Sequence, residues 1–334
     1  MTSTPVRRVP LSQARDYTRL KIRHKAAERP TRTSPGSRMP TASALQRILA
    51  PLSVDDFVDK YFQRKPLKLT GKPGKFDFLF RESDFLANLD RVKHIRAVFP
   101  QNRQARIQPQ EIADMMDAGA TICVTGMERA YSKLRQAARR IRAELNYAGE
   151  VSFRAYLSPP GSGFDLHFDA RVATTLQIAG TKRWWFSTEP AVPFPVYNSG
   201  REPSGLRRYK APPLEKLRSV LLRPGDVLCL PAGVWHRAKG STMSLALNMA
   251  FDHKGAGVFD SIVTMLQQRL TDDAGWREPL PVFANGKRQG LPKPVAGMLR
   301  KRIDALQVEL QELRQDEAKL TRAWRMAVRA DVRK

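Results

Sequence analysis

The sequence predicts a mainly β protein with flanking helices, in which the strands form a sandwich or barrel. Short apolar segments separated by Pro and Gly turns follow one another between residues 151 and 251. Helical periodicity is found before and after this stretch. We therefore divide the chain into four segments, residues 1–41, 42–149, 150–256 and 257–334.

Residues 1–41 are rich in Arg, Lys, Ser, Thr and Pro and contain few large apolar side chains. A segment of this composition buries too little to fold, so we expect a disordered basic arm. The whole chain has 58 Lys and Arg against 32 Asp and Glu, a formal net charge of +26. This charge favours polyanions, so the arm and the tail are candidates for contact with nucleic acid or ribosomes. The alternative is an ordinary solvated surface that uses much arginine.

Residues 42–149 are expected to form a helical or mixed region that packs on the barrel. The pattern Ser-Val-Asp-Asp at residues 53–56 begins a helix, and residues 66–70 form a short strand closed by a Pro-Gly turn. Between residues 128 and 145, apolar side chains recur at three- and four-residue steps. This spacing predicts an amphipathic helix with Arg and Lys on its outer face.

The strands of the barrel itself are expected within residues 150–256. Their predicted ranges are 151–157, 172–179, 183–187, 219–222, 226–230 and 244–251. Residues 190–213 hold many Pro, Gly and charged residues and predict a long insertion between the two halves of the barrel, over the mouth of its pocket.

Helices return in residues 257–334. One apolar stripe runs from residue 259 to 270, and a short heptad-like register runs from 303 to 324. The second of these helices is basic and amphipathic, and it either packs on its own domain or pairs with another chain. A homodimer is therefore one of the expectations.

The two cysteines, Cys123 and Cys229, lie in apolar, strand-like runs. This setting favours buried free thiols over a disulfide. No apolar stretch approaches the roughly 18 residues that a membrane span needs, and the basic N-terminus lacks the apolar core of a secretory signal. We therefore expect a protein without a membrane segment, in the reducing cytoplasm.

His167, Asp169 and His236 are the candidate metal ligands. Side chains two apart in a strand point to the same face, so His167 and Asp169 are expected to enter the same interior. His236 follows a strand and a second turn through Pro231 and Gly233. Two imidazoles and one carboxylate are the facial triad of non-haem Fe(II) oxygenases, which leaves coordination positions open. The alternative is a core histidine near a hydrogen-bonding aspartate.

Three segments, residues 156–169, 176–184 and 224–236, together resemble the JmjC/cupin oxygenases. They are most similar to the branch that contains ribosomal-protein hydroxylases, which shares the Pro-Pro-Gly-Ser approach to the first ligand and the Leu-Gln-x-x-Gly-x-Lys-Arg-Trp strand pair. The resemblance extends from about residue 45 to 255. It implies a double-stranded β-helix, Fe(II), 2-oxoglutarate, O2, and hydroxylation or demethylation of a protein.

The resemblance also implies roles for residues beyond the triad. Lys182 would pair with the distal carboxylate of 2-oxoglutarate, unless it is a solvent-facing lysine beside Arg183. Tyr156 would reach the cosubstrate or substrate, or else serve as a core tyrosine. Asn248, a polar residue in an apolar strand, would lie near the metal-bound end of 2-oxoglutarate, or bond to a loop. Thr175 is placed in the same pocket.

We therefore expect an Fe(II)- and 2-oxoglutarate-dependent dioxygenase that hydroxylates a side chain of a ribosomal or other basic protein. One alternative oxidises a peptide or small metabolite, or demethylates a side chain. Another is a non-enzymatic cupin scaffold that binds RNA or ribosomes, against which the intact triad argues. The ribosomal hydroxylases carry C-terminal dimerisation and winged-helix regions, whereas only residues 257–334 follow the barrel here.

Overall fold

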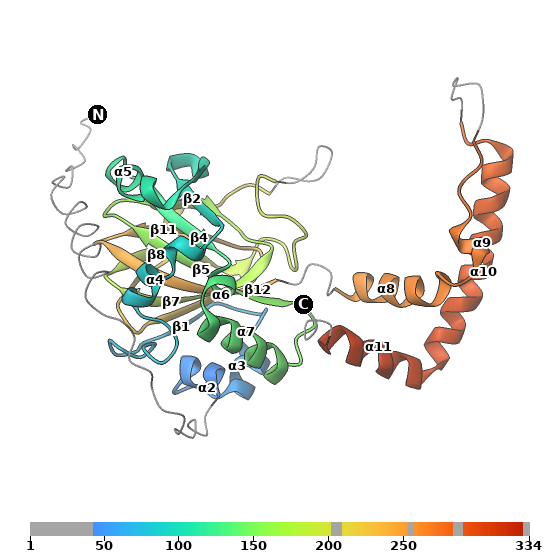
Figure 1. Ribbon diagram of the computed structural model, residues 1–334, viewed down its shortest axis with the longest axis horizontal. Helices are drawn as coiled ribbons and strands as arrows, with labels where there is room; N and C mark the ends of the chain where they lie inside the picture. The colour runs from blue at the N-terminus through green and yellow to red at the C-terminus, as the bar shows by residue number, and fades with distance from the viewer. Residues whose placement is uncertain (1–42, 202–208, 253–256, 283–289, 330–334) are drawn as a thin grey trace. The chain divides into compact units, whose positions relative to one another are not determined.

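A computed structural model describes residues 43–201, 209–252, 257–282 and 290–329 (Figure 1). The predicted basic arm, residues 1–41, and part of the predicted insertion therefore lie outside the described residues. The chain divides into two compact units, one with residues 1–145 and 150–252 and the other with residues 146–149 and 253–334.

The first unit is built on two antiparallel sheets. The larger has eight strands in the order β1-β10-β7-β12-β5-β4-β2-β3, and the smaller has four in the order β6-β11-β8-β9. The strands of the larger sheet are β1 Leu67–Leu69, β2 His94–Val98, β3 Gln104–Ile107, β4 Thr121–Thr125, β5 Glu150–Ser158, β7 Arg171–Ala179, β10 Val227–Leu230 and β12 Ser244–Asp252. Those of the smaller sheet are β6 Gly163–His167, β8 Lys182–Pro190, β9 Arg218–Leu222 and β11 Val234–Gly240. This architecture confirms the predicted mainly β fold with flanking helices.

Residues 42–149 contribute strands as well as helices. Strands β1 to β4 extend the larger sheet on both sides, so this region shares the sheet instead of only packing on it. Its α-helices are α2 Ala44–Leu49, α3 Val54–Lys60, α4 Glu82–Ala87, α5 Ile112–Asp117, α6 Met127–Ala130 and α7 Ser132–Glu144. The predicted helix over 128–145 is thus divided in two, because Tyr131 adopts an extended backbone between α6 and α7.

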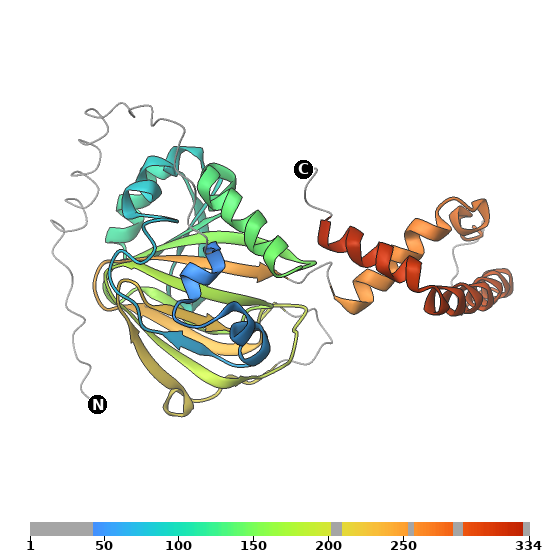
Figure 2. The ribbon, with the colours of Figure 1, turned by 90° about the horizontal axis from the view of Figure 1, so that it is seen from below.

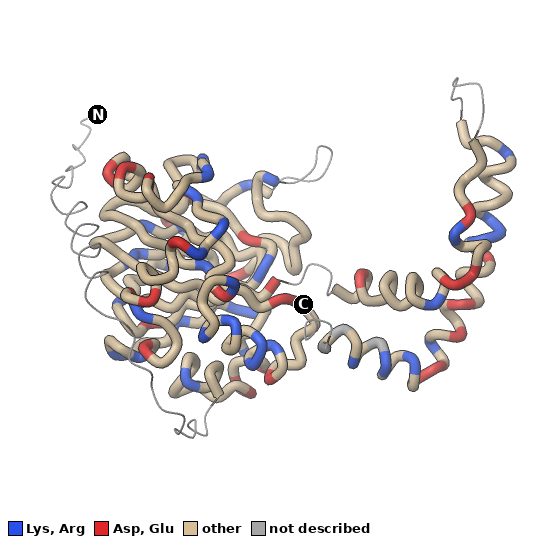
Figure 3. The backbone as a smooth tube through the Cα atoms, viewed as in Figure 1, with Lys and Arg blue, Asp and Glu red and all other residues tan. Residues whose placement is uncertain are grey.

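Helix α7 covers the outer face of β5 (Figure 2). Its buried side chains Leu134, Ala137, Ala138 and Ile141 share one face, and its Lys and Arg residues, blue along the tube in Figure 3, fall at the positions between them, most of them exposed. Strand β5 alternates in burial along its length. Phe153 and Leu157 are buried on the side of α7, and the alternate residues Arg154 and Tyr156 face the interior between the sheets.

The second unit consists of helices α8 Val258–Leu270, α9 Ala274–Arg277, α10 Lys293–Gln315 and α11 Glu317–Arg329. The predicted heptad-like helix is broken at Asp316, whose carboxylate Oδ1 accepts a hydrogen bond from the Lys319 amide at 2.8 Å and so caps α11. Within the described part of the chain, no helix has the length and apolarity to cross a membrane. Cys123 and Cys229 are buried free thiols, as predicted.

Candidate metal centre

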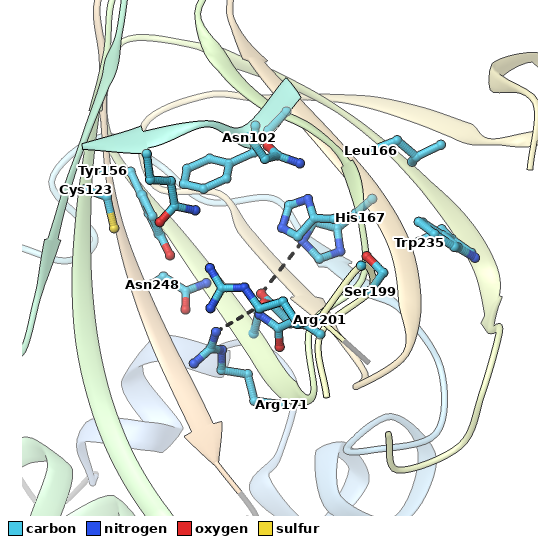
Figure 4. A pocket seen from close by; sticks show the side chains of 18 of the residues that line it. Asn102, Cys123, Tyr156, Leu166, His167, Arg171, Ser199, Arg201, Trp235 and Asn248 are labelled. Atoms are coloured by element: carbon cyan, nitrogen blue, oxygen red, sulfur yellow. Dashed lines mark hydrogen bonds and ion pairs between the residues drawn. The ribbon is translucent and has the colours of Figure 1, made fainter. Parts of the chain in front are cut away.

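The long-range pairing of β6 with β11 brings His167 and His236 together. The two residues are direct partners across these strands, and their ring centroids lie 4.3 Å apart. Asp169 lies just beyond the end of β6, in the turn that leads to β7, so its convergence with His167 comes from the turn and not from strand alternation. Candidate ligand atoms of the three side chains lie within 4.8 Å of one another, and Figure 4 shows His167 in the pocket they line.

Each imidazole is oriented by a backbone carbonyl. His167 Nδ1 lies 2.7 Å from the Asp165 carbonyl oxygen, and His236 Nδ1 lies 2.9 Å from that of Val234. A carbonyl only accepts, so Nδ1 carries a proton in both rings, which leaves Nε2 as the candidate ligand atom of each. Burial lowers the pKa of His236 to about 4, assisted by the nearby His167. His236 is therefore a neutral imidazole, the form that ligates a metal.

Asp169 is held as a carboxylate with one oxygen already engaged. Its Oδ1 accepts hydrogen bonds from Arg171 Nη2 at 3.1 Å and from Asn198 Nδ2 at 2.9 Å. Its Oδ2 faces His236 Nε2 at 4.0 Å. Burial alone would raise the pKa of Asp169, but the positive charges of Arg171 and, to a smaller extent, Arg154 oppose this, and the pKa lies well below its usual range.

Asn198 is a site residue that the sequence reasoning missed. Besides binding Asp169, its Oδ1 accepts a hydrogen bond from the Ala170 amide at 2.8 Å, so one side chain fixes both the carboxylate and the turn that carries it. It lies in the predicted insertion, where an asparagine among Pro, Gly and charged residues is an ordinary loop residue. Only the folded turn shows what it contacts.

Asn198→Ala is expected to weaken binding of a divalent cation by about 10- to 100-fold, the usual effect of losing a residue that orients a ligand. Titration of the metal-free protein with Co(II), followed by absorption or calorimetry, measures this. The neighbouring Ser199→Ala is the control, since Ser199 Oγ accepts from the Phe168 amide and does not bind Asp169. Equal affinities of wild type and Asn198→Ala would show that Asn198 does not position the carboxylate.

The cavity at these residues has a volume of about 570 Å³ and lies against the inner face of the larger sheet. Strand register arranges this face in rows. One row contains Thr121 and Ser158, the next contains Cys123 and Tyr156, and the third contains Thr125, Arg154, Asn248 and Thr175. The second and third rows contribute Cys123, Tyr156, Arg154 and Asn248 to the lining of the cavity.

Lys182 lies beside the first row and is buried, with 2% of its surface exposed. Its ammonium donates to Ser158 Oγ at 2.8 Å, and Ser158 Oγ also accepts from Thr121 Oγ1 at 3.0 Å. No carboxylate among the described residues pairs with it, and burial lowers its pKa to about 8. The structure thus excludes the solvent-facing alternative. Lys182 does not itself line the cavity, whereas Tyr156, whose ring centroid lies 6.0 Å from Nζ, does.

Tyr156, Asn248 and Thr175 also lie together on this face. Tyr156 packs edge-on against Phe164, and burial raises its pKa to about 12, so its hydroxyl stays protonated. Asn248 lines the cavity and donates from Nδ2 to Thr175 Oγ1 at 3.1 Å. Asn248 thus bonds to a neighbouring strand and not to a loop. Thr175 is buried and is not among the residues that line the cavity.

Comparison with known proteins identifies residues 131–257 as a match to the JmjC domain family. An uncharacterised Bacillus subtilis protein, YxbC, is 27% identical over 262 residues, which are 71% of this chain and 79% of that one. The Aedes aegypti protein named bifunctional lysine-specific demethylase and histidyl-hydroxylase NO66 is 24% identical over 205 residues. That match covers 57% of this chain and only 31% of NO66.

Solved structures show the same fold. The Escherichia coli ribosomal oxygenase YcfD, determined in complex with cobalt and 2-oxoglutarate, matches with a TM-score of 0.53 and 16% identity. The match covers 83% of this chain and 71% of YcfD.

Proposed function

We propose that the protein, whose residues 131–257 match the JmjC domain family, is an Fe(II)- and 2-oxoglutarate-dependent oxygenase that hydroxylates a protein side chain. The JmjC-type fold expected from the sequence is confirmed by the family match and by the structural likeness to YcfD. The observation that carries the proposal is the convergence of His167, Asp169 and His236 at one cavity.

The three side chains fit a divalent iron ion. Two imidazoles and one carboxylate are the donors of a facial triad, and three protein ligands leave positions open for other groups. Asn198 and Arg171 hold Asp169 from the side away from His236, so that Oδ2 stays available. His167, Asp169 and His236 would therefore hold the metal.

The buried Lys182 fits a carboxylate. A cation at this depth without an anionic partner is costly, and a carboxylate would supply the missing charge and accept from Nζ. Lys182 and Ser158 would bind the distal carboxylate of 2-oxoglutarate, with Tyr156 and Asn248 along its length toward the metal. Ser158 was not among the residues that the sequence reasoning selected, because a serine in a strand gives no sign of what it faces.

The bound iron and cosubstrate would supply the oxidation, in which O2 places one oxygen atom in a substrate C–H bond and the other in succinate as 2-oxoglutarate loses CO2. The chain's own residues orient these groups and exclude water. The neutral Tyr156 and Asn248 offer hydrogen bonds without adding charge, and the aromatic rings of Phe164 and Trp184 form apolar walls beside the histidines.

The proposed substrate is a protein, with ribosomal proteins as the first candidates. YcfD is described as a ribosomal oxygenase and NO66 as a histidyl-hydroxylase and demethylase, and the net charge of +26 suits work near ribosomal RNA. Two buried free thiols fit the cytoplasm as the place of action. Exposed apolar side chains on α10, such as Ile303 and Val308, would suit a homodimer contact.

The test has two parts. The metal-free protein, reloaded with Fe(II) and given 2-oxoglutarate in air, is expected to convert it to succinate. The same protein without iron is expected to form no succinate. Mass spectrometry of the host proteome with and without the gene is then expected to find a protein site that loses an addition of about 16 Da, one oxygen atom. A strain that carries Asp169→Ala serves as the control. Absence of any iron-dependent succinate would contradict the proposal.

A further inference from the structure

The cavity is lined by several arginines and by very little negative charge. Four arginines contribute to its lining: Arg96 on β2, Arg154 on β5 and Arg171 on β7, from three strands of the larger sheet, and Arg201 from the loop after β8. Asp169 is the one acidic side chain that lines the cavity in the described part of the chain. This is a cationic wall beside the candidate metal ligands.

Arg171 and Arg96 differ in how their charges are balanced. Arg171 pairs with Asp169 at 3.1 Å and lies 3.9 Å from the Asp252 carboxylate. Arg96 instead donates only to neutral groups, which are Gln104 Oε1 at 2.6 Å and Cys123 Sγ and Thr125 Oγ1, both at 3.4 Å. Arg96 is thus held in place by its neighbours, and no carboxylate in the described part of the chain pairs with its charge.

Arg154 has even fewer partners. Within the described residues its side chain makes no hydrogen bond or ion pair, and its Nε is fully buried without an acceptor. The strand register places Arg154 opposite Thr125 on one side and opposite Asn248 on the other. The Asp169 carboxylate feels the charge of Arg154 but does not bond to it. A partly buried guanidinium that lines a cavity without a hydrogen-bonded anion is costly unless a ligand supplies one.

Thr125 brings Arg96 and Arg154 together. Its Oγ1 lies 3.4 Å from Arg96 Nη2, and the residue is the direct partner of Arg154 across β4 and β5. Side chains of paired residues lie on the same face of a sheet, about 4.5–5.5 Å apart at Cβ. Arg96, the strand partner of Cys123, and Arg154, the strand partner of Thr125, therefore lie in adjoining rows of the same face, and both line the cavity, where one anion would meet two guanidinium groups.

The metal and cosubstrate of the proposed function do not neutralise this pair. The two negative charges of 2-oxoglutarate equal the two positive charges of Fe(II). The negative charge of Asp169 equals the positive charge of Lys182, so these four groups together are neutral. Arg171 has Asp169 and Asp252 as neighbours. Among the described residues, neither Arg96 nor Arg154 has a hydrogen-bonded counterion, and both lie outside the row that contains Ser158 and its partner Lys182.

Resting on the proposed function, we propose that Arg96 and Arg154 select the substrate by binding a carboxylate of an Asp or Glu side chain, in the oxidised residue or beside it. The same two charges repel an arginine, a lysine or a methylated lysine from the cavity. The enzyme is thus a hydroxylase of acidic or acid-flanked residues, even where the protein that contains them is basic as a whole.

The test uses blocked peptides in which one fixed residue stands among randomised positions, added to the full chain with Fe(II) and 2-oxoglutarate. Mixtures with Asp or Glu fixed are expected to raise succinate release above the peptide-free rate, and mixtures with Lys or Arg fixed are not. Arg154→Gln and Arg96→Gln are each expected to raise the KM for the acidic mixture about tenfold or more, the loss of one charge-assisted contact. Arg154→Glu is expected to lose the response to acidic mixtures and gain one to Lys mixtures.

Arg183→Gln is the matched control, because Arg183 is exposed on β8 and contacts Ser219 away from the cavity. It is expected to keep the wild-type preference. Peptide-free, iron-dependent succinate release without a preference for acidic mixtures overturns this inference and leaves the proposed function standing. A change confined to the KM for 2-oxoglutarate in Arg154→Gln overturns it as well. If no condition gives iron-dependent succinate, the proposed function itself fails.

Discussion

Asp169→Ala is expected to abolish iron-dependent succinate release, with a fall of more than about 100-fold, beyond the loss typical of residues that only orient a ligand. The variant removes the one anionic ligand and also frees Arg171 and Asn198, whose partners are on Asp169 Oδ1. His167→Ala and His236→Ala remove the imidazoles that face each other across β6 and β11 and should have effects of the same size. Metal content and succinate release measure each loss.

A fall in activity could also come from unfolding, so metal binding is followed by stability. Co(II) is expected to raise the melting temperature of the wild type, because a ligand that binds only the folded state stabilises it, and to leave that of Asp169→Ala unchanged. Asp114→Ala is the control, since Asp114 is an exposed carboxylate on α5. Undiminished turnover in both Asp169→Ala and His167→Ala would refute the triad.

The sequence contains the ligand types but not the contacts that bring them together. His167 and His236 meet because β6 pairs with β11, and neither strand stands out as an alternating apolar pattern. Buried and partly exposed residues do not alternate cleanly along either strand, since one face lines a polar cavity. The predicted reason for the pairing of His167 with Asp169, alternation within one strand, differs from the observed one, which is the turn after β6.

The helices show a similar limit. Apolar periodicity correctly indicated helical segments at 128–145 and 303–324, but it did not reveal the helix breaks at Tyr131 and Asp316. A break of one residue hardly shifts the apolar face, so the pattern continues across it. At Asp316 a local signal existed, because an aspartate followed by Glu317 is a common helix start, and the structure uses it as a cap.

Only some of the polar residues around the proposed cosubstrate site could be predicted from the sequence. Lys182 stood out through the resemblance of its strand pair to an oxygenase family, whereas Ser158 and Asn198 did not. Serine and asparagine occur on any surface, and their roles here depend on contacts with residues far along the chain, Lys182 for one and Asp169 for the other. Such contacts are set by the tertiary fold and leave no trace in local composition.

Lys182→Ala is expected to raise the KM for 2-oxoglutarate by about 10- to 100-fold, since a hydrogen bond to a charged group contributes about 1.5–3 kcal/mol. Its ammonium is buried and bonded to Ser158, with no competing carboxylate among the described residues. Lys182→Arg keeps the charge and is expected to recover part of the affinity, limited by the space for a larger head group. Exposed Lys216→Ala on the 3-10 turn at 214–216 is the control and should leave the KM unchanged.

The same lysine predicts how cosubstrate binding depends on pH. Burial lowers the pKa of Lys182 to about 8, so below that pH the ligand-free protein already carries the charge that a carboxylate needs. Above it the neutral amine predominates, a proton must be taken up with the ligand, and the KM for 2-oxoglutarate should rise about tenfold per pH unit. Lys182→Arg stays protonated and should lose this alkaline rise. A KM that is flat from about pH 7 to 9 in the wild type and insensitive to Lys182→Ala would mean that the cosubstrate carboxylate binds elsewhere.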